Sequence, residues 1–171
     1  MIAIRFVAFA ALASALFAQK PADIDGWDKI HWGMTIADAR SVYGVHSQAE
    51  KTDDWTLLTL KPVKIAGVEM GVQAGARHGS EKITSVRLWS YFGLATSAPG
   101  AGAQDFDALR AALIQQYGLP AKEEVDHGEN FRLLKTVSWK FPSTSILMTL
   151  EQSTSLPNLG NIILEYTSAA R

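Results

Sequence analysis

The sequence predicts an α+β fold in which an antiparallel sheet carries helices packed on one face. Two segments repeat apolar residues at helical spacing, and several others alternate apolar and polar residues as half-buried strands do. The second half of the chain repeats the order of the first, so we expect two α-β-β-β units in tandem. Because each helix offers one apolar stripe and several strands alternate cleanly, one sheet face is expected to be partly solvated.

The first predicted helix runs from about Thr35 to Tyr43 and carries sequence signals at both ends. Thr35 is a candidate N-cap, and Asp38 three residues later completes a capping-box pattern. Gly44 follows the last helical position and can adopt the left-handed conformation at which many helices end.

Three β-segments are expected after this helix. Residues 55–61 are rich in β-formers, residues 68–74 alternate between apolar and polar types, and residues 83–92 form the third segment. Ala66-Gly67 is expected to turn the chain just before the second of them.

A run of small residues and proline at 95–103 divides the chain roughly in two and is expected to be a flexible connector. The predicted organisation is therefore a first half at residues 30–94 and a second half at residues 104–168. The second half opens with the clearest helix of the sequence, with Asp105 as its candidate cap and Gly118 as its end.

The rest of the second half consists of a charged stretch and three more β-segments. Asp126-His127-Gly128-Glu129 is expected to form a turn, and alternation predicts strands around residues 137–141, 146–150 and 162–166. Both predicted helices end in Tyr-Gly, which supports a duplicated unit. The alternative is one irregular α+β domain with coincidental helix ends.

Residues 1–18 are expected to be a cleavable secretory signal peptide. One positive charge precedes an uncharged apolar run of 12 residues, Phe6 to Phe17. As a helix this run is about 18 Å long, too short for a hydrocarbon core of roughly 30 Å. Cleavage after Ala15 or after Ala18 fits, and residues 19–29 then form a polar lead-in that is loosely ordered up to about Trp27. The protein is therefore expected to be exported, either periplasmic or secreted.

Composition excludes several classes of site and partner. The chain has no cysteine, which excludes a lipoprotein anchor, disulfides, a thiol nucleophile and thiolate metal sites. Its formal net charge of −1 provides no electrostatic footprint for nucleic acid. No other apolar run could span a bilayer, so neither a membrane span nor a lipid anchor is expected after cleavage.

No catalytic or metal motif is found, and we expect no catalytic residue, metal or cofactor. None of the four histidines forms a closely spaced ligand pair, and a solvated loop or turn explains His46, His127 and their acidic neighbours. Ser80 lies beside His78 and Glu81, but the strand-turn-helix context of a nucleophilic serine is missing.

The five tryptophans suggest a binding surface instead. On the segment 83–92, Val86 and Leu88 define one face, and Arg87, Trp89 and Tyr91 occupy the other. If the first face is core, these three side chains form an exposed row of types enriched in protein-binding hot spots. The alternatives are that both faces are buried, or that the Trp89 side is the core.

Two stretches resemble small exported modules of bacterial envelopes. Trp32-Gly33-Met34-Thr35 followed by the helix and Gly44 is similar to the opening of the SmpA/OmlA-type outer-membrane assembly lipoproteins. Tyr117-Gly118-Leu119-Pro120 followed by Trp139 is similar to a later part of the same pattern, which the β-lactamase-inhibitor-like proteins share. The resemblance implies an α+β fold used for non-catalytic protein binding. The chain lacks the lipobox cysteine of the first group and the disulfides of the second.

We therefore expect an exported, non-enzymatic binding module that recognises another envelope or extracellular protein through an open sheet face. A small-ligand or glycan-binding protein that uses the same aromatic residues is the alternative. A hydrolase of unknown type is a third possibility, and it would require a concave pocket that gathers histidines and carboxylates.

Overall fold

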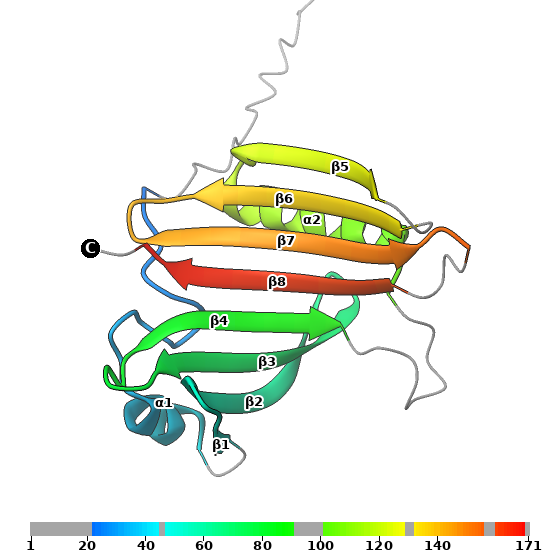
Figure 1. The fold of residues 1–171 in the computed structure, drawn as a ribbon. Coiled ribbons are helices and arrows are strands. Elements are labelled where there is room, and N and C mark those ends of the chain that lie inside the picture. Colours follow the sequence, from blue (N-terminus) through cyan, green and yellow to red (C-terminus); the bar gives the residue numbers. More distant parts are fainter. Residues whose placement is uncertain (1–21, 45–46, 91–100, 129–131, 156–159, 170–171) are drawn as a thin grey trace, which may run out of the picture.

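The computed structural model describes residues 22–44, 47–90, 101–128, 132–155 and 160–169; the expected signal peptide, residues 1–18, lies outside them. The fold is one eight-stranded antiparallel sheet with two helices (Figure 1). The elements are α1 (Ile36–Tyr43), β1 (Gln48–Lys51), β2 (Trp55–Ile65), β3 (Val68–Arg77), β4 (Ile83–Ser90), α2 (Ala103–Tyr117), β5 (Lys122–Gly128), β6 (Arg132–Lys140), β7 (Thr144–Ser153) and β8 (Gly160–Ser168). The predicted mixed α+β class with an antiparallel sheet is confirmed.

The strands follow the order β1-β2-β3-β4-β8-β7-β6-β5, so β4 and β8 meet in the middle and β1 and β5 form the edges. Each helix is followed by four strands, and the expected count of three is wrong. The sequence missed both edge strands because neither shows apolar alternation. In β5, residues 122–127 are all exposed, and the strand is defined by its backbone pairing with β6. The expected turn at residues 126–129 is therefore partly the end of β5.

Local signals set the ends of the helices. In α1, the Asp38 amide donates to Thr35 Oγ1 (3.1 Å) and the Thr35 amide donates to Asp38 Oδ2 (3.3 Å), which confirms the capping box. In α2, Asp105 acts from the third helical position, where its Oδ2 accepts from the Gly102 amide (3.0 Å). The helix thus begins at Ala103, inside the segment expected to be a connector; residues 95–100 of that segment lie outside the described chain.

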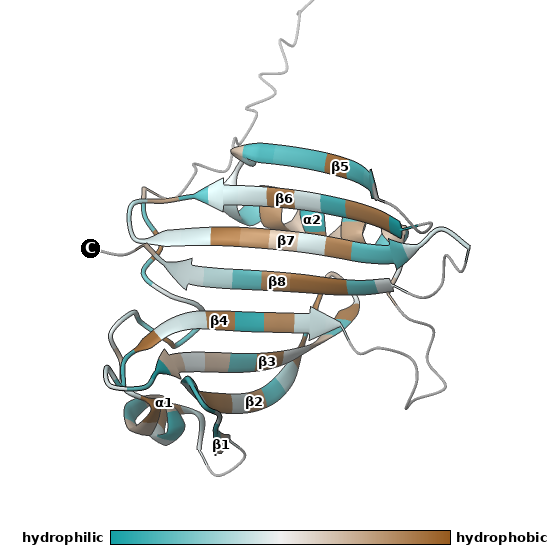
Figure 2. Cartoon of the chain, in the orientation of Figure 1, coloured by the Kyte–Doolittle hydropathy of each residue, from teal (hydrophilic) through white to brown (hydrophobic). Residues whose placement is uncertain are grey.

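One face of the sheet carries the core. The register aligns a single row of side chains across six strands, each of them at most 1% exposed: Leu58, Ala74, Val86, Tyr166, Ile146 and Trp139. Both helices belong to the same buried cluster, α1 through Ala39 and α2 through residues such as Phe106 and Leu109. Figure 2 shows apolar and polar residues alternating along β4, as expected for a strand between two different faces, whereas β8 carries an unbroken apolar stretch, Ile162 to Leu164.

The N-terminal lead-in makes tertiary contacts earlier than expected. The amide and the hydroxyl of Ser143 donate to the Asp23 carboxylate, at 2.8 and 2.6 Å. Thr144 Oγ1 donates to the Ile24 carbonyl and accepts from Trp32 Nε1 (2.7 Å). The start of the described chain is therefore attached to the β6–β7 turn, in the opposite half of the protein. Such long-range contacts leave no periodic signal in the sequence.

Two buried tyrosines link α2 to the centre of the sheet. Their hydroxyl oxygens, on Tyr117 and Tyr166, lie 3.3 Å apart. Burial raises the pKa of Tyr166 well above its usual range, and the neighbouring Tyr117 adds to the shift. Burial likewise raises the pKa of Tyr117, and burial followed by a hydrogen bond to Asp28 raises that of Tyr43. All three groups are therefore held neutral in the folded protein.

We expect the free energy of unfolding to fall as the pH rises above about 10, the usual pKa of tyrosine. Above that value the unfolded chain releases tyrosine protons that the folded chain retains, so the unfolded state binds fewer protons and stability declines with pH. Urea unfolding at intervals between pH 8 and pH 11.5 measures the slope. Tyr166→Phe removes one of the shifted groups and should give a shallower decline; an identical slope in this variant would contradict the assignment.

Candidate functional site

The sheet face opposite the core carries the residues that the sequence singled out. On β4, Val86 and Leu88 are fully buried, while Arg87 on the other face is exposed and Trp89 is half-buried. Tyr91, the third member of the predicted row, lies outside the described residues. In Figure 1, α2 is seen behind the strands, so the face toward the reader is the one that carries Arg87 and Trp89.

A glycine in the neighbouring strand lets the Trp89 ring lie against the sheet. Gly71 on β3 is the cross-strand partner of Trp89. A Cβ atom at Gly71 would lie 2.6 Å from both Cε2 and Cζ2 of the indole, closer than any side chain tolerates. The ring therefore occupies the space above a bare backbone, a common use of glycine within a strand. This arrangement fixes the ring and leaves part of it in contact with solvent.

A second tryptophan repeats this arrangement at the other end of β3. A Cβ atom at Gly75 would lie 3.1 Å from Cε3 of Trp55, and the Arg77 guanidinium lies 5.2 Å from the centre of that indole. The Trp55 ring thus lies close to the Gly75 backbone and has the Arg77 guanidinium within cation–π range. The sequence did not predict the contact between Trp55 and Arg77. Gly71 and Gly75, four residues apart on the polar face of one strand, were the pattern that could have indicated it.

The register adds residues from the second half of the chain. Ile163 is the cross-strand partner of Trp89, Glu165 is that of Arg87, and Leu147 on β7 lies opposite Glu165. Leu147 is 43% exposed, which is high for a leucine in a central strand. We call these five residues the open-face patch: Arg87, Trp89, Leu147, Ile163 and Glu165. The sequence did not predict its last three members, because only strand pairing brings them to Arg87.

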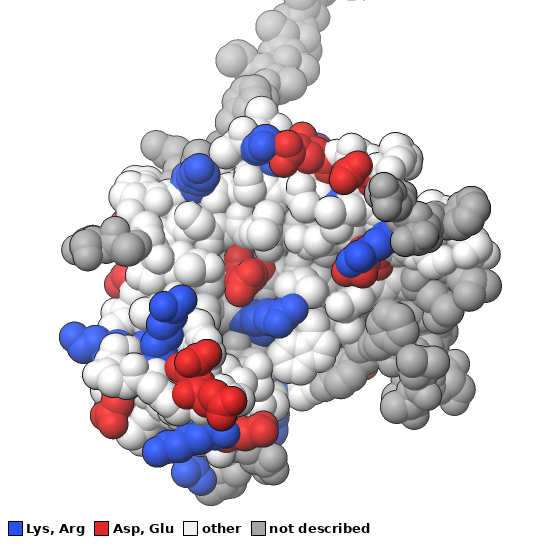
Figure 3. Space-filling model, in the orientation of Figure 1, with Lys and Arg blue, Asp and Glu red and all other residues white. Residues whose placement is uncertain are grey.

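The surface around the patch is mainly uncharged. Figure 3 shows acidic and basic side chains gathered toward one corner and along one edge of this face, and acidic and basic atoms near its centre, over β8 and β4. Arg87 and Glu165 are directly opposed in the register, where unlike charges on neighbouring strands attract. The patch therefore combines an apolar row, Trp89 with Ile163, and a charged pair next to it.

The other candidate groups do not converge on a reactive site. His31 Nδ1 lies 3.9 Å from Asp25 Oδ2, and both side chains are about two-thirds exposed. Ser80 donates to the Arg77 carbonyl (3.2 Å) within a turn, and His127 is exposed on edge strand β5. His46 lies outside the described residues. Over the ranges that the structure describes, no three His, Asp or Glu side chains are grouped closely enough to hold a metal ion.

No helix in the described ranges is long and apolar enough to cross a membrane. Comparison with known proteins gives no relative: no protein-family model, no curated protein and no solved structure matches the chain.

Proposed function

We propose that this chain is an exported, non-enzymatic binding module that recognises another envelope or extracellular protein through the open-face patch. The observation that carries the proposal is the Trp89 indole held against Gly71 beside the exposed Arg87, on the sheet face opposite the two described helices. Tryptophan and arginine are among the residue types that dominate binding energy in protein interfaces.

The patch is arranged to bind with little loss of conformational freedom. Its residues lie on central strands, and the Trp89 ring is already held in place by the backbone beneath it. Rigid anchors reduce the entropy lost on association. The partly exposed apolar side chains, Ile163 and Leu147, would be the centre of such an interface, with Arg87 and Glu165 supplying polar contacts.

A glycan is the second candidate ligand, and the paired tryptophans favour it. Trp89 and Trp55 lie over Gly71 and Gly75, which are four residues or about 13 Å apart along β3. Two indoles from the strands on either side of β3 are a pair of flat surfaces on which sugar rings of one oligosaccharide could stack. Thermal-shift measurements with oligosaccharides distinguish the ligands, since a sugar that binds the folded chain raises its melting temperature by mass action.

We also infer that the two halves are copies of one helix-plus-sheet unit, and that export relies on residues 1–18. The duplication is supported by three shared features: an Asp at the third position of each helix, a Gly at each C-cap with φ near +80°, and four antiparallel strands after each helix. Such tandem units are what the resemblance to β-lactamase-inhibitor-like proteins implies. Membership in that group stays a proposal.

The Arg87→Ala/Trp89→Ala double variant is expected to weaken capture of the partner from envelope extract by at least tenfold, because hot-spot truncations typically cost about 2 kcal/mol or more each. Gly71→Ala should act in the same direction, since its Cβ would displace the indole while leaving both Arg87 and Trp89 in the chain. Quantitative mass spectrometry of captured proteins measures the loss.

Lys29→Ala/Leu119→Ala provides the matched control, since it also removes one exposed cation and one exposed apolar side chain, away from the patch. This control should capture the partner as the unaltered chain does. Equal capture by all variants would show that the open-face patch is not the binding surface.

A further inference from the structure

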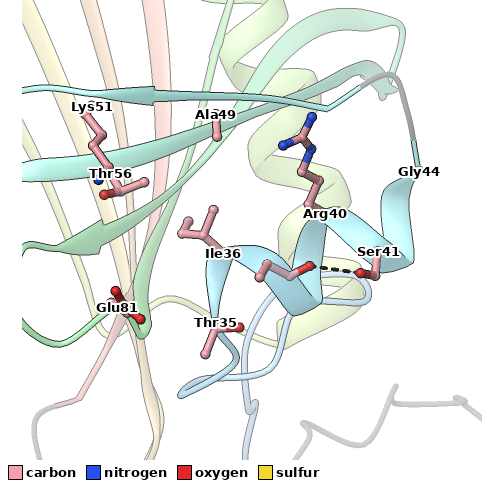
Figure 4. Close-up of a pocket in the computed structure, with 10 residues that line it drawn as sticks. Thr35, Ile36, Arg40, Ser41, Gly44, Ala49, Lys51, Thr56 and Glu81 are labelled. Carbon is pink, nitrogen blue, oxygen red and sulfur yellow. Dashed lines mark hydrogen bonds between the residues drawn. The ribbon is translucent and has the colours of Figure 1, made fainter.

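A hollow of about 710 Å³ lies between α1 and the strands β1 and β2. Figure 4 shows its lining: Ile36 and Arg40 from the helix face Ala49 and Lys51 from β1, and Glu81 of the β3–β4 turn closes one end. Thr56 of β2 also lines it, on the same sheet face as buried Leu58. The hollow is therefore on the helix-bearing side of the sheet, away from the open-face patch.

The hollow exists because the two helices cover the sheet unequally. Helix α1 has 8 residues and buries one of them, Ala39. Helix α2 has 15 residues and buries four, Phe106, Leu109, Leu113 and Tyr117. Part of the sheet in the first half is consequently left without a helical cover. A volume of this size is within the range of roughly 300–1,000 Å³ that small-molecule sites occupy.

The lining has an apolar middle and an uncompensated cation at one end. Ile36 and Ala49 face each other across the hollow, and the Arg40 guanidinium points from α1 toward β1 (Figure 4). In the parts of the chain that the structure describes, Arg40 forms no ion pair. Lys51 and Glu81, which carry opposite charges, lie on the far side of Ile36. The net electrostatic attraction at the Arg40 end is therefore for an anion.

We propose that the hollow binds a small amphipathic carboxylate, such as a medium-chain fatty acid. Its hydrocarbon chain would lie over Ile36 and Ala49, and its carboxylate would pair with Arg40. The planar guanidinium presents two parallel N–H donors, which match the two oxygens of a carboxylate. Lys51 and Thr56 would face the distal end of the hydrocarbon chain. This binding is independent of the open-face patch, so its failure would leave the proposed partner recognition untouched.

The test compares dodecanoate with dodecanol, two ligands of equal chain length that differ in the anionic group. Both are titrated into the purified full chain below their aggregation concentrations, by isothermal titration calorimetry. We expect dodecanoate to bind about tenfold more tightly than dodecanol, and Arg40→Gln to remove this preference while leaving dodecanol binding unchanged. Lys140→Gln, an exposed cation on the opposite sheet face, should keep the preference.

A second variant tests the hollow itself. Ala49→Phe fills the space between β1 and Ile36, so it should weaken both ligands by tenfold or more while the melting temperature shows that the variant remains folded. Absence of dodecanoate binding to the unaltered chain would overturn the proposal. So would dodecanoate binding that neither Arg40→Gln nor Ala49→Phe weakens.

Discussion

Replacing Trp139 with alanine is expected to lower the free energy of unfolding by about 3–5 kcal/mol, the usual loss for a large aromatic side chain in a core. Trp139 is 1% exposed and ends the row of core residues that crosses six strands. Its Nε1 donates to the carbonyl of Gly118, the residue that ends α2, at 2.8 Å. The substitution therefore opens a cavity and also leaves a helix-terminal carbonyl without its partner.

Urea unfolding followed by circular dichroism measures this loss. Trp139→Phe keeps most of the packing and removes the hydrogen bond, so it should lose clearly less stability than Trp139→Ala. Leu119→Ala is the surface control, because Leu119 is 77% exposed and should change stability by no more than about 0.5 kcal/mol. A loss below 1 kcal/mol for Trp139→Ala would be incompatible with the packing described.

Gly26→Ala is expected to destabilise the protein by about 3 kcal/mol or more, although it adds a single methyl group. Gly26 has φ +124°, a conformation that side chains disfavour at a cost of order 1–3 kcal/mol. Its Cβ would also lie 1.8 Å from the Ile30 carbonyl oxygen, so the backbone must move. That carbonyl accepts from the Trp27 amide (2.9 Å), and the bridge between the two residues would be disturbed.

Gly33→Ala distinguishes the cost of the backbone conformation from the cost of the steric clash. Gly33 also has a positive φ, +88°, but a Cβ atom there meets nothing within 4 Å. This variant should lose only about 1 kcal/mol, the cost of the backbone conformation alone. Thermal unfolding of the two variants side by side gives the comparison, and equal losses would rule out the collision at Gly26 as the main cause.

The features that the sequence predicted correctly are those set by neighbouring residues. The capping box of Thr35 and Asp38 involves residues three apart, so it can be recognised in the sequence without knowledge of the fold. The turn at Ala66-Gly67 is equally local, and both residues adopt positive φ there. The long strands of the core were visible because burial on one face imposes alternation on the sequence.

The features that were missed depend on pairing between distant residues. Strand β5 is defined by β6, and its own residues carry no apolar pattern. The sequence placed Arg87 and Trp89 on the face opposite Val86, but it could not identify Ile163 and Glu165 as their neighbours, because register is a property of two strands. The hollow beside α1 likewise depends on how much of the sheet a short helix leaves uncovered.

The central position of β8 has a consequence for how the chain can fold. Strand β8, residues 160–168, pairs with β4 of the first half and with β7 of the second, so its pairing with β4 is the one that joins the two sets of described strands into one sheet. Until it emerges during synthesis, β4 and β7 each present an unpaired edge, the kind that invites association with other chains. Completion of the sheet thus waits for a strand that follows the other seven in the chain, and the β4–β8 pairing closes a long loop of chain, which slows folding. Until β8 is available, the first four strands and the strands β5 to β7 therefore cannot join into one sheet.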